Sequence, residues 1–419
     1  MKIKGIKKIE YSGDVYNLHI KDNHNYFANN HCVSNCHEFD DVMSDFISIK
    51  INENIIKKLK FSNEYLVLSK LNSVNTIDEY IEYLTYLFSE INQSIVEIED
   101  NLGIGSAIGD KRDVRLSKIT GVPNVDLKMM QVISDLKQYS LKIEIFLKEY
   151  RIKPGNWVLE TYQNEKSKIM EYSLEPIWAY DYLEKYIWSR YDTVVLMSGT
   201  ILDKNLFSKL NGIDLERTVY YSVPSPFPLK NRMIYYMPLG KMSYNKKETT
   251  FKNFVPWIHK ILAKYKGSKG IIHTNSFELS NWIENDVKNE RLIFHDSENK
   301  TELLRMHFES DKDTVFVSPS ASTGISFDHD KSRFQIIAKI PYPSLGSQKN
   351  KLRKEANSDW YSWKTCCNLQ QATGRSVRSM TDYADTIIID ESFGDIIKYN
   401  SKYLPEWFQV SIKKVEVKK

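Results

Sequence analysis

The spacing of apolar residues divides the chain into three stretches. Up to about residue 33, apolar and polar residues alternate and turn-forming segments separate the runs, which predicts short strands. From residue 51 to about 170, apolar residues recur at intervals of three and four, which predicts amphipathic helices. Beyond Pro176, short apolar runs alternate with helical segments, which predicts an α/β domain.

Five runs in the last stretch are rich in β-branched residues and contain almost no polar residues. Such runs are typical of strands buried on both faces, as in a mainly parallel sheet covered by helices. The runs are residues 193–197, 270–273, 314–317, 335–338 and 386–389. The lysine-rich end at 413–419 is expected to be a solvated, frayed terminus.

The composition limits the possible functions. A chain of 419 residues is too long for one compact core, so several domains are expected. Lys and Arg number 58 against 54 Asp and Glu, which gives a net charge of +4, so a nucleic-acid site must be a local groove and not a polybasic surface. Four cysteines are too few for a disulfide framework, which indicates a reducing compartment. No apolar run is long enough for a membrane span or a signal peptide, so we expect a cytoplasmic protein without a membrane partner.

The segment Gln371-Ala-Thr-Gly374-Arg375-Ser-Val-Arg378 carries the sharpest chemical signal. We expect the two arginines to lie three residues apart on a helix and so to share one face. Each offers a planar, permanently charged group for phosphate oxygens, and such groups stabilise the charge that develops in phosphoryl transfer. An isolated Arg-x-x-Arg would more often be part of a salt-bridged surface helix, so the neighbouring motifs decide between the two interpretations.

Those neighbours are polar loops that follow predicted strands. Ser198-Gly199-Thr200 follows the strand at 193–197, and Ser322-Thr323-Gly324-Ile-Ser326-Phe-Asp328 follows the strand at 314–317. Ligands bind at the carboxyl ends of the strands in open α/β sheets. Together with the arginine motif, these segments resemble superfamily 2 helicases, and more narrowly the XPD/DinG branch. The resemblance covers residues from about 36 to the C-terminus.

The resemblance implies a role for each segment. Ser198, Gly199 and Thr200 would couple two RecA-like lobes, and Gly324, Ser326 and Asp328 would contact nucleotide and DNA. Arg375 and Arg378 would be arginine fingers within a motif that also contains Gln371 and Gly374. Thr274, Asn275 and Ser276 resemble the helicase loop that touches the nucleic-acid backbone, and core or loop packing is the equal alternative for this segment. Ser322 and Thr323 would also bind DNA. The sequence departs from the branch at Thr323, where Glu is common, and at Ser326, where Asp or Asn is frequent.

A helicase of this kind also needs a Gly-x-x-x-x-Gly-Lys-[Ser/Thr] phosphate loop, and the sequence contains none. The glycines at 103–109 precede Lys111 at the wrong spacing. Cys36-His37 matches the last two positions of the branch's Asp-Glu-x-His motif, whose acidic pair holds Mg²⁺. We therefore expect no metal ligand within this chain, Mg²⁺ held by an upstream Asp-Glu pair, and no ATP hydrolysis by this chain alone.

Residues 1–35 resemble the C-terminal fragment of a split intein, a small all-β (Hint) unit. The resemblance rests on 15–20, on 22–27, and on 31–35 followed by Cys36. It implies that Asn35 cyclises, that Cys36 is the acceptor nucleophile, and that His24 moves protons. Ser34 stands where His is usual, which shifts acid–base work to His24 or to the partner fragment. Since Met1 directly precedes this unit, splicing in trans is expected.

Three other interpretations of the N-terminal stretch stay open. It could be a plain β-hairpin or an inactive, intein-like remnant. A zinc site could use His31, Cys32, Cys36 and His37, although their spacing is not that of a standard finger.

The sequence therefore predicts a multidomain precursor of a phage-type DNA helicase. Its partners would be an N-terminal helicase half carrying the other intein fragment, and single-stranded DNA. It would use ATP and Mg²⁺ after splicing, and an iron–sulfur cluster could come only from the partner half. The alternative is a non-splicing fragment without ATPase activity that binds DNA or regulates. The expected parts are the intein fragment (1–35), the end of lobe 1's Mg²⁺ motif (36–50), an α-helical arch-like insertion (51–175), the return to lobe 1 (176–203) and the α/β RecA-like lobe 2 (204–419).

Overall fold

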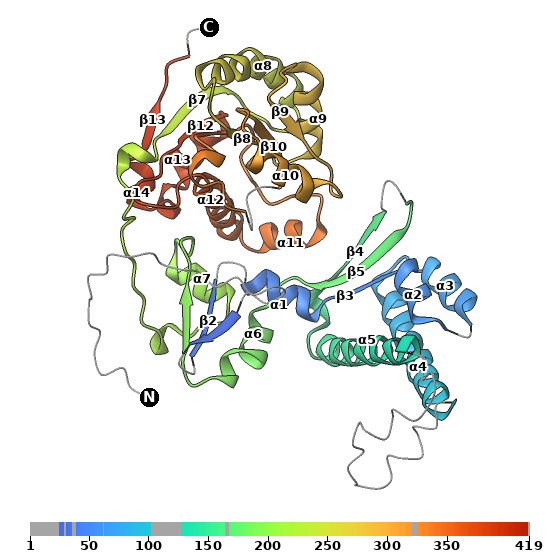
Figure 1. The fold of residues 1–419 in the computed structure, drawn as a ribbon. Helices are drawn as coiled ribbons and strands as arrows, with labels where there is room; N and C mark the ends of the chain where they lie inside the picture. The colour runs from blue at the N-terminus through green and yellow to red at the C-terminus, as the bar shows by residue number, and fades with distance from the viewer. Residues whose placement is uncertain are drawn as a thin grey trace.

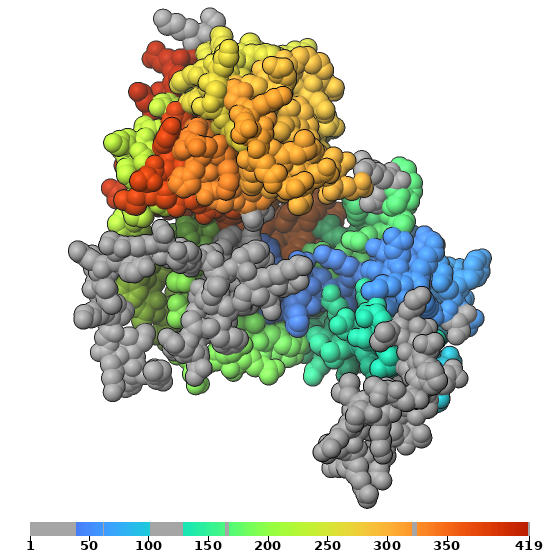
Figure 2. Space-filling view, viewed as in Figure 1, coloured from blue at the N-terminus to red at the C-terminus, as the bar shows by residue number. Residues whose placement is uncertain are grey.

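The computed structural model describes residues 25–28, 31–35, 39–61, 63–101, 127–163, 167–320 and 325–417, and up to residue 35 it describes the backbone alone. Figure 1 shows a large sheet with its helices, a small sheet below it, and a helical part to one side. In the space-filling view the C-terminal part forms one mass that rests on the other two (Figure 2).

The C-terminal part is built on a seven-stranded sheet in the order β13-β7-β12-β11-β8-β10-β9, and every neighbouring pair is parallel. Each residue of β8, β10 and β11 is buried. Gly270 in β8 allows the Phe334 ring to approach closely, since a Cβ there would lie 2.4 Å from it. The strands are β7 (Ile234–Gly240), β8 (Gly270–His273), β9 (Leu292–Phe294), β10 (Val315–Ser318), β11 (Phe334–Ile337), β12 (Asp385–Asp390) and β13 (Ile412–Lys414).

Helices cover this sheet, and several begin at a side chain that accepts a hydrogen bond from the first turn. Ser276, Ser347 and Asn357 cap three of them in this way. The helices are α8 (Lys247–Lys264), α9 (Phe277–Asp286), α10 (Lys300–Glu309), α11 (Gln348–Ala356), α12 (Ser358–Thr373), α13 (Ser392–Tyr399) and α14 (Glu406–Gln409). Short 3₁₀ turns cover Leu229–Asn231, His329–Lys331 and Ser401–Tyr403.

Four of the predicted strands form this parallel sheet, which confirms its prediction. The prediction of a frayed C-terminus was wrong for residues 413–415, because β13 pairs with β7 and Val415 donates its N–H to the Tyr236 carbonyl at 2.8 Å. Lysines suit this position since β13 is an edge strand.

The side part contains the helices α2 (Glu53–Leu59), α3 (Glu64–Asn72), α4 (Ile77–Asn101) and α5 (Leu127–Ile152). Thr76 and Glu79 form a reciprocal capping box at the start of α4. The prediction of a wholly helical stretch was incomplete, because this part also contains an antiparallel sheet in the order β3-β5-β4. Its strands are β3 (Ile49–Asn52), β4 (Trp157–Gln163), which follows a 3₁₀ turn at Pro154–Asn156, and β5 (Met170–Pro176).

The small sheet has the order β1-β2-β6 among the described residues. β1 (Asn25–Ala28) is antiparallel to β2 (His31–Asn35), and β2 is parallel to β6 (Val194–Met197). The described end of the predicted intein unit thus pairs with the strand that precedes Ser198. Nearby elements are α1 (Phe39–Ile47), α6 (Tyr180–Tyr186), α7 (Lys204–Leu210) and 3₁₀ turns at Trp188–Arg190 and Leu215–Arg217.

Candidate functional site at the contact between the lobes

The end of α12 docks on the segment that follows β6. Gln370 donates its side-chain N–H to the Gly199 carbonyl, and Gln371 donates to the Thr200 hydroxyl at 3.3 Å. The Cys367 thiol donates to the Thr200 carbonyl at 3.3 Å. The structure therefore brings together two motifs that lie about 170 residues apart in the chain.

Two further contacts fix the same segment. The Trp363 indole N–H donates to the Ile201 carbonyl at 2.9 Å. The Ser198 and Thr200 hydroxyls lie 3.1 Å apart, and the Thr200 N–H donates to the Ser198 hydroxyl at the same distance. Because α12 contacts this segment through these groups, a movement of α12 would displace the segment that follows β6. The sequence analysis did not single out Trp363, Cys367 or Gln370.

The two arginines lie beyond α12 and not on it. The helix ends at Thr373, and the Gly374 N–H bonds back to the Gln370 carbonyl at 3.0 Å. The predicted common helix face was therefore wrong. Arg375 is buried and donates from Nη1 to the Ile325 carbonyl at 2.9 Å, whereas Arg378 is exposed.

Asp382 organises the loop that carries these arginines. Its carboxylate is fully buried and forms an ion pair with Arg333 at 2.9 Å. It also accepts the backbone N–H groups of Arg378 at 3.2 Å and His329 at 3.1 Å. A buried carboxylate with several donors is a strong anchor, so Asp382 holds the arginine loop against the loop at 325–329.

Polar groups beneath this loop are also satisfied. Gln335 donates to the Thr373 carbonyl at 2.6 Å and to the Thr386 hydroxyl at 2.7 Å, and its carbonyl oxygen lies 3.3 Å from His273 Nε2. Burial lowers the pKa of His273 to about 4, so this imidazole is neutral at pH 7. The site therefore rests on a rigid, uncharged network.

The predicted DNA loop is fixed by internal contacts. Thr274 is fully buried with its hydroxyl 2.7 Å from that of Ser280, Asn275 donates to the Lys339 carbonyl, and Ser276 caps α9. Asn275 has a φ of +53°, a conformation that Asn tolerates better than most residues. These three side chains therefore shape the loop, and their contact with DNA stays a prediction.

The remaining predicted positions differ in their surroundings and in how far the structure describes them. Ser326 is exposed, and Asp328 forms an ion pair with Lys331 at 2.8 Å. Ser34 and Asn35 lie in β2, where only the backbone is described. Six predicted residues lie outside the described residues: His24, Cys36, His37, Ser322, Thr323 and Gly324.

A set of ion pairs that sequence reasoning missed joins α1 to the C-terminal part. Arg353 in α11 is almost fully buried and binds Asp40 at 2.7 Å, while its Nε donates to the Ile177 carbonyl. Its guanidinium carbon lies 5.1 Å from the ring centre of Trp178 and 5.4 Å from that of Trp360. Lys364 in α12 binds Asp41 at 2.8 Å. Although burial opposes it, Lys364 holds the pKa of Asp41 at about 2.

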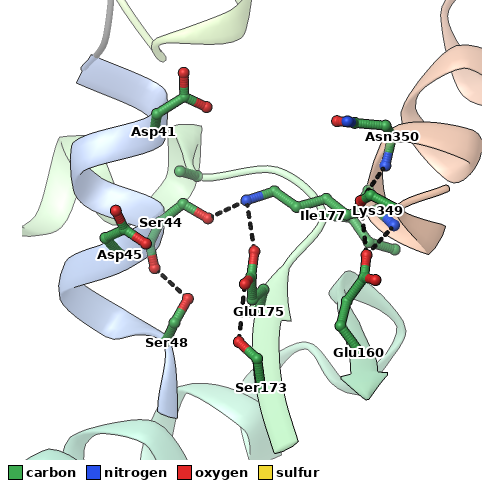
Figure 3. A network of polar contacts seen from close by, with 12 residues as sticks. Asp41, Ser44, Asp45, Ser48, Glu160, Ser173, Glu175, Ile177, Lys349 and Asn350 are labelled. Carbon is green, nitrogen blue, oxygen red and sulfur yellow. Dashed lines mark hydrogen bonds and ion pairs between the residues drawn. The ribbon is translucent and has the colours of Figure 1, made fainter. Parts of the chain in front are cut away.

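The antiparallel strands β4 and β5 of the side part also contact α11, close to α1 (Figure 3). The Lys349 ammonium points between α1 and β5, where it donates to the Ser44 hydroxyl and binds Glu175 at 3.2 Å. Glu160 in β4 accepts the Lys349 N–H at 2.9 Å and the Ser347 hydroxyl at 2.7 Å. One polar network therefore connects α1, the strands β4 and β5, and α11.

The described part of the chain lacks two kinds of feature. It holds no group of three or more His, Cys, Asp or Glu side chains arranged to bind a metal ion. It also holds no helix that is both long and apolar enough to cross a bilayer.

Comparison with known proteins agrees with this geometry. Residues 258–411, which include the arginine loop, match the family described as "Helicase C-terminal domain". The fold of the chain is similar to a solved structure named "XPD_Helicase" (15% identity, TM-score 0.53), over 91% of this chain and 67% of that one.

Two more solved structures are similar over 91% of this chain. "XPD_APO" is 16% identical with a TM-score of 0.55 and is covered over 76% of its length. "Structure of S. tokodaii Xpd4" is 16% identical with a TM-score of 0.50 and is covered over 74%. The region that matches this family therefore lies within a fold that is similar to these three structures and that also includes the small sheet and the helical part.

Proposed function

We propose that this chain is the C-terminal precursor of an ATP-dependent DNA helicase, which protein splicing joins at Cys36 to an N-terminal helicase half. The contact between α12 and Ser198–Thr200 carries the helicase part of the proposal, because it connects the arginine loop to the lobe that would hold ATP. The residue types at 34–36 carry the splicing part.

The splicing chemistry balances with the residues present. The upstream acyl group passes from the partner's intein fragment to the Cys36 sulfur as a thioester, because a thiolate is a strong nucleophile. The bond between the upstream half and that fragment breaks, and overall the fragment leaves with a free amino terminus. The Asn35 side-chain nitrogen then attacks its own backbone carbonyl, which breaks the bond to Cys36 and leaves a succinimide on the released fragment. The freed Cys36 amine attacks the thioester, so that a peptide bond forms and the thiol is regenerated. His24 would move the protons, with Ser34 beside the cyclising residue.

In the joined helicase, ATP would lie between the two lobes. The upstream half would supply the phosphate loop and the Asp-Glu pair for Mg²⁺, which His37 would follow. Arg375 and Arg378 would meet the γ-phosphate, where cationic groups stabilise developing charge. Asp382 supports this role because it anchors their loop. The contact of Gln371 with Thr200 would pass the change in nucleotide state to the other lobe.

The splicing part is tested by mixing this chain with an N-terminal helicase half that carries the other intein fragment. Mass spectrometry should show loss of residues 1–35 and a new peptide bond at Cys36. Asn35→Ala should stop release of the fragment, and Cys36→Ala should stop transfer of the upstream half. A chain that stays unchanged over days would instead favour a DNA-binding or regulatory module without splicing.

The motor part is tested in the joined protein with Arg375→Ala. ATP turnover should fall by about 10³-fold or more while nucleotide binding persists, since an arginine finger acts mainly in the transition state. The matched control is Arg305→Ala, because Arg305 is exposed on α10 of the same domain. Full turnover in Arg375→Ala would remove the arginine-finger assignment.

A further inference from the structure

The edge of β6 is occupied by the strand that ends at the junction. β2 runs parallel to β6, with Asn35 opposite Met197 and Val33 opposite Val195. β1 lies on the far side of β2, so β2 is the central strand of this small sheet. β6 is one unbroken apolar run, Val-Val-Leu-Met, and its backbone groups need a partner strand.

The chain just after the junction is anchored independently of β2. α1 begins at Phe39, which is buried and lies 5.3 Å from Trp188 between ring centres. Asp40 and Asp41 tie α1 to Arg353 and Lys364. These contacts involve no residue before 39, so they persist whichever segment is joined to Cys36.

This anchor restricts where a segment joined to Cys36 can lie. Residue 35 is four residues from Phe39, and an extended chain spans at most about 3.6 Å per residue, so residue 35 must lie within about 14 Å of the start of α1. A segment that follows the path of β2 into α1 would run in the same direction as β2. It is therefore suited to pair with β6 in parallel.

We propose that the edge of β6 is a shared slot, which residues 31–35 fill in the precursor and the last residues of the upstream half fill after splicing. This inference rests on the proposed function. The second occupant is a short extended segment that ends in the Asp-Glu pair, and its last residue takes the place of Asn35 opposite Met197. The intein strand is thus a placeholder that covers the edge of β6, which would otherwise be free to pair with other chains before the halves meet.

The first occupant is tested in the full chain without splicing. Cysteine replaces Val33 and Val195 in a background of Asn35→Ala with Cys32→Ser and Cys36→Ser, and disulfides are mapped by mass spectrometry after oxidation. The Val33→Cys/Val195→Cys pair should cross-link, because these positions are opposite one another.

The matched control pairs Val33→Cys with Met197→Cys, two residues out of register, which should cross-link far less. Equal cross-linking in both pairs, or none in the first, would overturn the placeholder.

The second occupant is tested by hydrogen exchange at the amides of Val194–Met197. They should be protected in the Asn35→Ala precursor, and they should stay protected in the spliced product after residues 1–35 have left. In the precursor, Val33→Pro should remove protection and Val33→Thr should keep it, because Pro disrupts the ladder.

Loss of protection on splicing would show that the upstream segment does not enter the slot and would overturn the shared occupancy. A chain that never splices would overturn the proposed function and the second occupant with it, whereas the cross-link alone decides the first occupant.

Discussion

The two sheets that contain β6 and β8 have similar strands but different surroundings. β8, β10 and β11 are short apolar runs whose residues are all buried. β6 is equally apolar, and Leu196 packs on the main core, yet Val195 is 41% exposed and Met197 is 54% exposed. An apolar strand matches a buried environment, so the composition of β6 suits a face that another layer covers. The upstream half that we propose would supply that layer.

A charged residue placed in each sheet tests most directly whether β8 and β6 differ in burial. Ile272→Asp should destabilise the C-terminal domain by more than about 4 kcal/mol, because Ile272 is fully buried and the carboxylate would have no partner. Val195→Asp should leave the stability of the unjoined chain within about 1 kcal/mol, since that position is exposed. Urea unfolding measures both.

In the joined helicase the result should differ. Val195→Asp should then lower the yield of assembled protein strongly, because the charge would be buried under the upstream layer. Normal assembly of Val195→Asp would show that the upstream half does not cover the exposed face of β6.

The ion pair between Arg353 and Asp40 joins α1, which lies next to the small sheet, to the C-terminal part. Arg353→Ala should cost about 3–5 kcal/mol, because it leaves the largely buried Asp40 carboxylate without its partner. The control is Lys402→Ala, whose pair with Asp359 is about 60% exposed on both sides and should matter by less than about 1 kcal/mol.

Chemical denaturation with a double-variant cycle separates charge from packing. Arg353→Met with Asp40→Asn should recover part of the lost stability, since it removes both charges while keeping volume. Equal losses in Arg353→Ala and in the double variant would show that packing on Trp178 and Trp360 dominates.

Acid should weaken the large sheet before it affects α1. Burial lowers the pKa of His307 to about 4, as it does for His273, from an ordinary value near 6.5. The unfolded chain therefore binds protons that the folded chain rejects as the pH falls from 6.5 to 4. Stability should drop by about 1.4 kcal/mol per pH unit for each histidine in this window.

Urea unfolding at pH 7, 6 and 5 measures this slope. His307→Gln should flatten it. Asp41 acts at lower pH: its stabilising charge is present above about pH 4 and is lost as the pH falls toward 2. An unchanged slope in His307→Gln would contradict the neutral, buried state of that imidazole.

The smallest expected effect is at the hydrogen bond between Gln371, near the end of α12, and Thr200, which follows β6. Gln371→Ala and Thr200→Val each remove one partner of a single 3.3 Å hydrogen bond, so their coupling energy should be about 0.5–1.5 kcal/mol in a double-mutant cycle. A coupling near zero would show that the two groups do not interact in solution.

Local patterns in the sequence predicted the strands of the large sheet well, because unbroken apolar runs report burial on both faces. They failed where a neighbour determines the structure. β13 is rich in lysine and becomes a strand only through its pairing with β7. The arginine motif was found from its residue types, but its position beyond α12 depends on the helix ending before Gly374. Thr274 has the type of a DNA-contacting residue, yet it lies buried beside Ser280.

By itself, the amino-acid sequence determined the apolar runs, the helical periodicity, and the reactive residue types at the junction and in the arginine motif. These are local properties that each segment carries wherever it lies. Only the tertiary structure decided that α12 meets Thr200, that Arg353 meets Asp40, and that the strand ending at Asn35 pairs with β6. Such contacts join residues more than 150 positions apart, and the packing of whole domains sets them because no local spacing encodes which distant surfaces will meet.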